Sequence, residues 1–248
     1  MNSSGAIQLD RPLTADQMRP GLLSSVVADD ELGDGRLRYR TQKLVGYTPK
    51  GQPIYQVKGS SRQNWSEMLA WQEADGPAVA NSAARSSLLI PASSPLAGQS
   101  GRFTLPADYF DVGKALRVTA QGRISTFTSG TLLLDVGIGS AVVFSGGAVT
   151  LVVSLTNKTW EMTALLSCRS VGATTAATIL GIGRLVSSAV VGSTGGAANS
   201  AMLPDSAPVV GGGFDSKVAN VLDLFATWSV ANAANSITLH NYALEALN

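Results

Sequence analysis

The chain has 248 residues, a formal net charge of +1 and only 14% charged residues. A nucleic-acid-binding protein of this size usually shows a basic face, so this balance argues against nucleic acid as a partner. A single cysteine, Cys168, excludes a disulfide framework within the chain and a cysteine-based zinc cluster. The N-terminus lacks the pattern of a signal peptide, and no apolar stretch approaches the roughly 18 residues of a membrane span. We therefore expect a soluble protein that folds in a reducing cytoplasm.

The chain changes character near residue 86. More than half of its charged residues lie in residues 1–85, whereas the rest is dominated by Gly, Ala, Ser, Thr and Val in short runs. We therefore predict two regions: an extended N-terminal attachment arm over residues 1–85 and a β-sandwich domain over residues 86–248.

Two elements are predicted within the arm. The stretch GYTPKGQPIYQVKG has two strand-like runs around a Pro-Lys-Gly-Gln turn, which predicts a hairpin over residues 43–58. In SSRQNWSEMLAWQEADGP, apolar residues recur at helical spacing, which predicts a short helix over residues 62–74. A helix of about three turns is marginal alone in water. Its two tryptophans therefore indicate docking, either on the chain's own domain or on a partner.

Residues 78–100 are predicted to form a linker that contributes one edge strand around residues 88–90. Beyond it, about eight strand-like runs are separated by Gly, Asn, Ser or Thr clusters, which is typical of an all-β, antiparallel β-sandwich. The strand count fits a jelly roll, and another Greek-key sandwich is the alternative. Strand side chains alternate between two faces, and two runs carry a five-residue apolar face that we expect in the core. These faces are Trp160, Met162, Ala164, Leu166 and Cys168, and Leu222, Leu224, Ala226, Trp228 and Val230.

Two middle runs, TLLLD and LVVSL, are apolar on both faces. In an antiparallel sheet this pattern means that the second face is covered as well. Covering by another copy of the domain would explain it, which predicts twofold or threefold association.

A long segment, residues 192–217, exceeds the usual length of a hairpin loop, and such loops are usually functional or mobile. Its apolar side chains favour an interface role over disorder. They are Met202, Leu203, Val209, Val210 and Phe214.

The sequence shows no legible catalytic chemistry. His240 is the single histidine, no G-x-S-x-G motif occurs, and the carboxylates of the second region are scattered rather than paired. Ligand clustering for a metal is lacking. The glycine-rich pieces at residues 137–142 and 211–213 lack the context of a nucleotide-binding loop and are explained as turns. We therefore expect no enzymatic activity, no cofactor and no metal site.

A family resemblance rests on several of these stretches. GYTPKGQPIYQVKG resembles a glycine-framed hairpin of capsid-associated proteins of tailed bacteriophages. RFTLPADYFDVGKALRVTAQGRIST, followed by TLLLDVGIGSAVVF, TWEMTALLSCRS and WSVANAANSITLHNYALEALN, resembles a family of phage virion β-sandwich proteins. In that family an extended N-terminal region precedes a compact jelly-roll-like domain that is commonly trimeric. The resemblance covers residues 40–58 and 100–248 and transfers no active-site residue.

The resemblance implies a virion structural protein, made in the host cytoplasm and assembled on the particle exterior. We expect a capsid decoration or cement protein whose arm binds the major capsid protein and which associates with itself as a homotrimer. The alternative is a minor tail or fibre protein whose sandwich binds a host receptor. Nucleic acid and membranes are not expected partners. The predicted partner-binding residues are Tyr47, Ile54, Tyr55, Trp65, Met68, Leu69 and Trp71 in the arm, and Met202, Leu203 and Phe214 in the long loop.

Overall fold

The computed structural model describes residues 66–127, 130–192 and 198–247 in full, and before them the backbone of four short strands. The chain divides into two compact units. The first comprises Met1–Gly46 and Pro53–Gln63, and the second comprises Tyr47–Gln52 and Asn64–Asn248.

The four short strands form two pairs. β1 (Val26–Ala28) pairs with β2 (Leu37–Tyr39) in antiparallel register. β3 (Gln42–Tyr47) pairs with β4 (Pro53–Val57) in a separate two-stranded sheet, at the place where the sequence predicts a hairpin.

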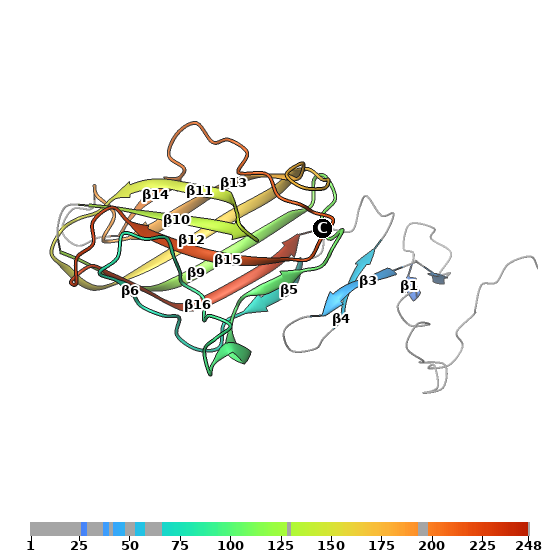
Figure 1. Cartoon of the computed structure of the whole chain (residues 1–248), viewed down its shortest axis with the longest axis horizontal. Helices are drawn as coiled ribbons and strands as arrows, with labels where there is room; N and C mark the ends of the chain where they lie inside the picture. Colours follow the sequence, from blue (N-terminus) through green and yellow to red (C-terminus); the bar gives the residue numbers. More distant parts are fainter. Residues whose placement is uncertain are drawn as a thin grey trace, which may run out of the picture. The chain divides into compact units, whose positions relative to one another are not determined.

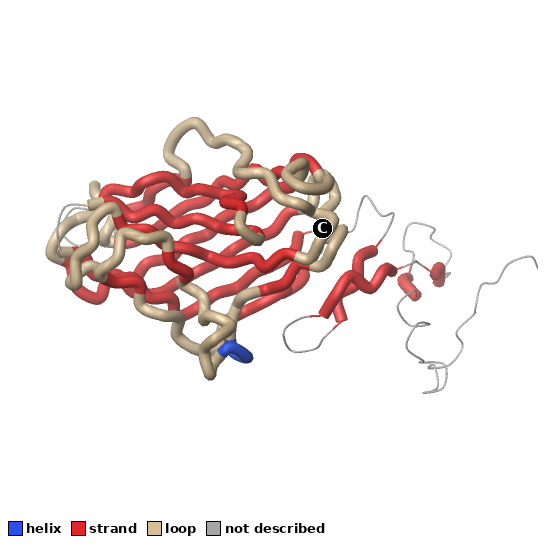
Figure 2. Tube along the Cα trace, in the orientation of Figure 1, coloured by secondary structure: helices blue, strands red, loops and turns tan. Residues whose placement is uncertain are grey.

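The second unit contains a sandwich of two antiparallel sheets (Figures 1 and 2). The predicted all-β antiparallel sandwich is therefore confirmed. The five-stranded sheet has the order β11 (Ala141–Thr150), β10 (Thr131–Ile138), β15 (Asn220–Trp228) and β7 (Ser86–Ser87), with β8 (Phe103–Leu105) also paired to β15. The seven-stranded sheet has the order β14 (Asn199–Leu203), β13 (Thr178–Ser187), β12 (Leu155–Ser170), β9 (Ala115–Thr126), β16 (Ser236–Leu247) and β5 (Ser66–Trp71), with β6 (Val79–Ala80) paired to β16.

The core lies between the two sheets and follows the predicted alternation. The apolar face of β12 from Trp160 to Cys168 is buried, and so are Leu222, Leu224, Ala226 and Trp228 of β15. Val230, which the alternation also assigns to this face, lies beyond the end of β15 and is exposed. Cys168 is a buried free thiol, and burial raises its pKa.

The predicted helix over residues 62–74 is wrong within the part that the structure describes, because Ser66–Trp71 forms strand β5 at the edge of the seven-stranded sheet. Pairing with β16 contains a register shift between Leu244 and Glu245, so Leu69 and the following Ala70 are both buried. This irregularity breaks the period of two that identifies a strand in sequence. The sandwich accordingly begins before residue 86.

Glycines also conceal one strand from sequence analysis. The runs SAVVFSG and AVTLVVSLTN look like two strands, but residues 141–150 form the single strand β11. A register shift opposite β10 falls at Gly146 and Gly147, where Gly147 has a φ of 73°. Glycine adopts this backbone conformation without steric cost, so the pair forms a bulge instead of a turn.

Connections close both sides of the sandwich. On one side, β5 and β6 pair with β16 of the seven-stranded sheet, whereas β7 and β8 pair with β15 of the five-stranded sheet. Residues 66–105 therefore connect the two sheets on this side. We call residues 77–102 of this connection the strap. On the other side, the amides of Gly211 and Gly212 donate to the carbonyls of Ile179 in β13 and Val142 in β11.

Candidate interaction surfaces

Two buried carboxylates lie on the outer face of the five-stranded sheet. The register pairs Asp135 of β10 with Phe225 of β15, and Gly137 with Asp223, so the four residues form a block. Both aspartates are at most 6% exposed, although they point away from the core between the sheets. Buried carboxylates need partners, and the strap supplies them.

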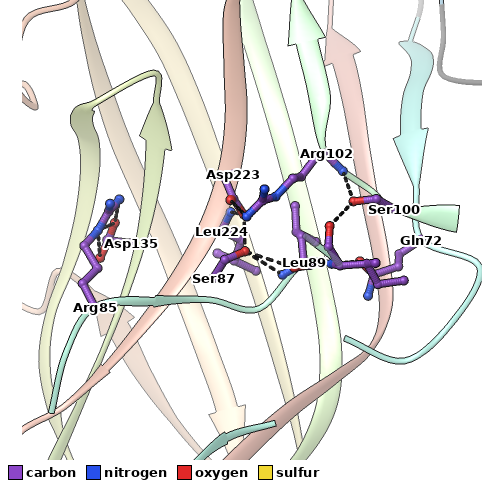
Figure 3. A network of polar contacts seen from close by, with 10 residues as sticks. Gln72, Arg85, Ser87, Leu89, Ser100, Arg102, Asp135, Asp223 and Leu224 are labelled. Carbon is purple, nitrogen blue, oxygen red and sulfur yellow. Dashed lines mark hydrogen bonds and ion pairs between the residues drawn. The ribbon is translucent and has the colours of Figure 1, made fainter. Parts of the chain in front are cut away.

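Arg85 covers the first half of this block. Its Nε donates to both carboxylate oxygens of Asp135, at 2.9 and 3.1 Å, and its guanidinium carbon lies 3.4 Å from the centroid of the Phe225 ring. Gly137 makes room for this arrangement, because a Cβ there would lie 2.8 Å from Nη2 of Arg85. The arginine therefore covers Asp135 and the Phe225 ring on the outer face, and Figure 3 shows its contact with Asp135.

Asp223 occupies the second half of the block and accepts several hydrogen bonds. Ser87 donates to Oδ1 at 2.7 Å, the amide of Leu224 donates to the same oxygen at 2.8 Å, and Nη2 of Arg102 lies 2.7 Å from Oδ2. Burial raises the pKa of Asp223, and these hydrogen bonds and charges act in the opposite direction. The carboxylate therefore ties two separate points of the strap to β15.

A second set of hydrogen bonds holds the middle of the strap (Figure 3). Gln72 accepts a bond from the amide of Ile90 at 3.0 Å, and Ser100 donates to the carbonyl of Ile90 at 2.7 Å. Leu88, Leu89 and Ile90 are fully buried. The predicted edge strand around residues 88–90 therefore lies two residues earlier, at β7, and the predicted residues are core anchors.

The strap covers part of the second face of β10 that sequence analysis assigned to another copy, whereas the LVVSL run is not a regular strand and its Val153 is exposed. Leu133 of the TLLLD run is half-buried, and the next outward positions of β10 are covered by Arg85 of the same chain. Sequence analysis missed Arg85, Ser87 and Arg102 as functional partners. The available signal was the presence of an aspartate inside each of two apolar strands, TLLLDVG and VLDLFAT.

The outer face of the seven-stranded sheet is built differently. Leu165 of β12 pairs directly with Ile182 of β13, and both side chains are exposed. Met202 of β14 is exposed and pairs directly with Arg184 of β13. Aliphatic and basic groups thus meet on this face. We call the outward residues of the seven-stranded sheet the large outer face.

The predicted partner-binding residues fall into three groups. Tyr47, Ile54 and Tyr55 lie on β3 and β4, of which only the backbone is described, and Trp65 lies outside the described residues. Leu69, Leu203 and Phe214 are buried in their own sandwich, so a partner cannot reach them in this fold. Met68 and Met202 are exposed, and Trp71 is half-buried with its Nε1 donating to Glu73 at 3.3 Å.

Two hollows lie elsewhere on the sandwich. One of about 400 Å³ lies between residues 77–82 and 86–91, and one of about 330 Å³ lies between β11 and residues 204–212. Small and aliphatic residues line most of both, and no charged side chain lines either. Ligand sites usually combine an apolar wall with a few convergent polar groups, and these hollows offer little of the second component.

Two titratable groups form local contacts. Nδ1 of His240 lies 2.6 Å from Oδ1 of Asp75, in an exposed pair. Nζ of Lys114 donates to the carbonyl of Tyr109 at 3.1 Å and lies 3.6 Å from the centroid of its ring. Burial lowers the pKa of Lys114 to about 8, against the charges of Asp111 and Glu67. Both contacts hold neighbouring segments together.

The part of the chain that the structure describes contains no group of three or more His, Cys, Asp or Glu side chains placed to hold a metal ion. In the same part, no helix is long and apolar enough to cross a membrane.

Comparisons with known proteins add a distant structural likeness. The sequence matches no protein-family model and no curated protein. The structure is similar to that of the CBM2 module of the evolved Dit of Lactobacillus casei BL23 phage J-1, with 10% sequence identity and a TM-score of 0.26. The match covers 59% of this chain and 68% of that chain. A likeness of this extent says nothing about what the present chain binds. The fold and the surfaces define an antiparallel β-sandwich with a strap fastened across one sheet and an open face on the other.

Proposed function

We propose that this chain is a structural protein of a tailed-bacteriophage virion, and that it decorates and reinforces the outside of the capsid. The N-terminal region binds the major capsid protein, and the sandwich stands on the shell as a stable module that associates with itself. The protein has no catalytic role in this proposal.

The observation that supports the proposal best is that both buried carboxylates of the sandwich form contacts within their own chain. Among the described residues, the buried charged side chains are Asp135 and Asp223. Catalytic sites usually present such groups to a cleft, with pKa values suited to a reaction. Here Arg85, Ser87 and Arg102 cover both carboxylates and fix the strap to the sheet. This arrangement favours a mechanical role over a chemical one.

The proposed mechanism is burial of additional surface. A protein that bridges shell subunits adds apolar and hydrogen-bonded area that internal pressure must break before the shell opens. The bridging module itself must not unfold first. A strap held by two arginine–aspartate pairs and by the buried side chains of residues 88–90 suits that requirement, because opening it would break both ion pairs and expose those apolar side chains.

The experiment that tests this function is a measurement of copy number in purified virions by quantitative mass spectrometry against the major capsid protein. Capsid decoration predicts a copy number equal to that of the capsid protein or a simple fraction of it. A handful of copies per particle would contradict decoration and would instead support the alternative, a minor tail or fibre protein with a receptor-binding sandwich. Light scattering of the purified protein at micromolar concentration tests self-association separately.

A further inference from the structure

The large outer face has an apolar centre. Leu165, Ile182 and Met202 are 45%, 43% and 52% exposed and come from three consecutive strands, β12, β13 and β14. Leu165 lies directly opposite Ile182. Met202 lies opposite Arg184, two residues along β13 from Ile182, and is therefore the diagonal neighbour of Ile182. The three side chains therefore form one contiguous cluster on the sheet.

Basic groups share the face with this cluster: Arg184 lies opposite Met202 and Arg117 opposite Leu165, and the others lie further along their strands. Arg123, Arg169 and Arg184 are exposed on the same face, and none of them has an ion-pair partner among the described residues. A fourth arginine, Arg117, pairs with Glu245 at 3.3 Å. The remaining carboxylate on this face, Glu161, accepts a hydrogen bond from Gln121. The face thus carries four arginines and two glutamates.

The dimensions of the face suit a folded partner. Six strands about 4.8 Å apart, rising about 3.3 Å per residue over a mean of about ten residues, make a surface of roughly 800 Å². A standard protein–protein interface buries about 800 Å² on each partner. Arginine and methionine are enriched in such interfaces, and both occur here around an aliphatic centre.

The same charges disfavour a second copy as the occupant. Two copies meeting through this face would bring eight arginines against four glutamates, and like charges in apposition oppose association. An acidic partner would instead neutralise Arg123, Arg169 and Arg184. A polyanion such as DNA would satisfy the arginines but would leave the aliphatic centre against phosphates.

We propose that the large outer face docks on a folded protein surface whose apolar centre is flanked by carboxylates, and that this surface belongs to the capsid shell. The inference rests on the proposed function and adds a second contact to the N-terminal one. Leu165, Ile182 and Met202 form the buried centre of the contact, and the three unpaired arginines form its rim.

The test measures binding of the full-length protein to purified phage particles assembled without it. Ile182→Glu places a charge in the apolar centre, and Arg184→Glu reverses a rim charge. We expect at least a tenfold loss of affinity for each variant, and a weaker dependence on salt for Arg184→Glu. Both side chains are exposed, so circular dichroism and thermal unfolding of the variants should match the wild type.

Two control variants make the result specific. Val221→Glu introduces the same charge at a side chain that is 41% exposed on β15 of the other sheet, and we expect its affinity to be unchanged. Arg184→Lys keeps the rim charge and should bind within about threefold of the wild type. Equal loss of affinity in Val221→Glu would show a nonspecific effect of added charge and would overturn the inference.

The remaining outcomes separate the inference from the proposed function. If the wild type binds the particles and Ile182→Glu and Arg184→Glu bind equally well, the docking face is refuted and decoration stands. If the wild type does not bind at all, decoration itself fails. Loss of self-association in Ile182→Glu with particle binding intact would identify a second copy as the occupant. Binding of a DNA duplex that Arg184→Glu abolishes would identify nucleic acid, and either result overturns the inference.

Discussion

Removal of Arg85 tests whether the strap depends on its ion pairs. The Arg85→Ala change leaves Asp135 buried without the guanidinium that donates to both of its oxygens. It also removes the stacking of that group on Phe225. The Asp135 side chain is 2% exposed while Arg85 covers it, so the change both removes the charged partner and opens the carboxylate to water.

The expected loss of stability follows from these contacts. Breaking a buried ion pair by removing one partner costs about 3–5 kcal/mol. One third of the Arg85 side chain is exposed and water reaches Asp135 once the arginine is gone, which places this case at the lower end, and the lost cation–π contact adds about 0.5–1 kcal/mol. We therefore expect the free energy of unfolding to fall by about 3–4 kcal/mol, which for a domain of this size lowers Tm by about 10 °C.

Urea unfolding followed by tryptophan fluorescence provides the assay, because Trp160 and Trp228 are buried in the sandwich. Arg117→Ala serves as the matched control, since its pair with Glu245 is exposed, and we expect a loss below about 1 kcal/mol. The double replacement of Arg85 by Met and Asp135 by Leu should recover most of the lost stability. A loss below about 1 kcal/mol in Arg85→Ala, or no recovery in the double variant, would refute this account of the strap.

Three further predictions concern titration and close packing. Burial raises the pKa of Asp223 above its ordinary value of 3.8, so between these two pKa values the folded chain holds a proton that the unfolded chain has released. Relative to Asp223→Asn, the wild type should therefore lose stability as the pH rises from about 3.8 through the raised pKa. Urea unfolding at several pH values measures this loss. Burial lowers the pKa of Lys114 to about 8, so the stability change with pH has the opposite sign: relative to Lys114→Met, the wild type should gain stability between pH 8 and 10.5. NMR titration of the Lys114 amine should give a midpoint near 8. A Cβ on Gly122 would overlap the backbone carbonyl of Thr238, so Gly122→Ala should lower the free energy of unfolding by about several kcal/mol, measured by thermal unfolding. Gly98 has open space around it, so the control Gly98→Ala should change stability by less than about 0.5 kcal/mol.

Strands with a strict alternation were predictable from the sequence. From Trp160 to Cys168, every second residue of β12 is apolar and faces the core, because a regular strand places alternate side chains on one side; Leu165 is the apolar exception on the outer face. β5 was not predictable in this way. Its bulge at Leu69 puts two consecutive residues into the core, and the resulting spacing imitates a helix. Tertiary pairing with β16 decides its structure, and no local pattern records that pairing.

The candidate surfaces were predictable only in part. Met68 and Met202 are exposed, whereas the neighbouring apolar residues Leu69 and Leu203 are buried. In a strand, adjacent residues point to opposite faces of the sheet, so one apolar segment contributes side chains both to the core and to the exposed face. Hydrophobicity alone therefore does not distinguish a contact residue from a core residue.

The two outer faces of the sandwich show how a covered face can be told from an open one. A second apolar face requires a cover, and the sequence of β10 and β15 places an aspartate among apolar residues on that face. The arginine and serine that satisfy these aspartates lie 50 and 136 residues away along the chain, so only the folded structure identifies them. Where each buried carboxylate already has a partner in its own chain, no external partner is needed to complete the face. The large outer face is the opposite case, because its exposed aliphatic centre and its arginines without carboxylates are left unsatisfied within the described part of the chain. An external protein partner should therefore be sought on the seven-stranded sheet.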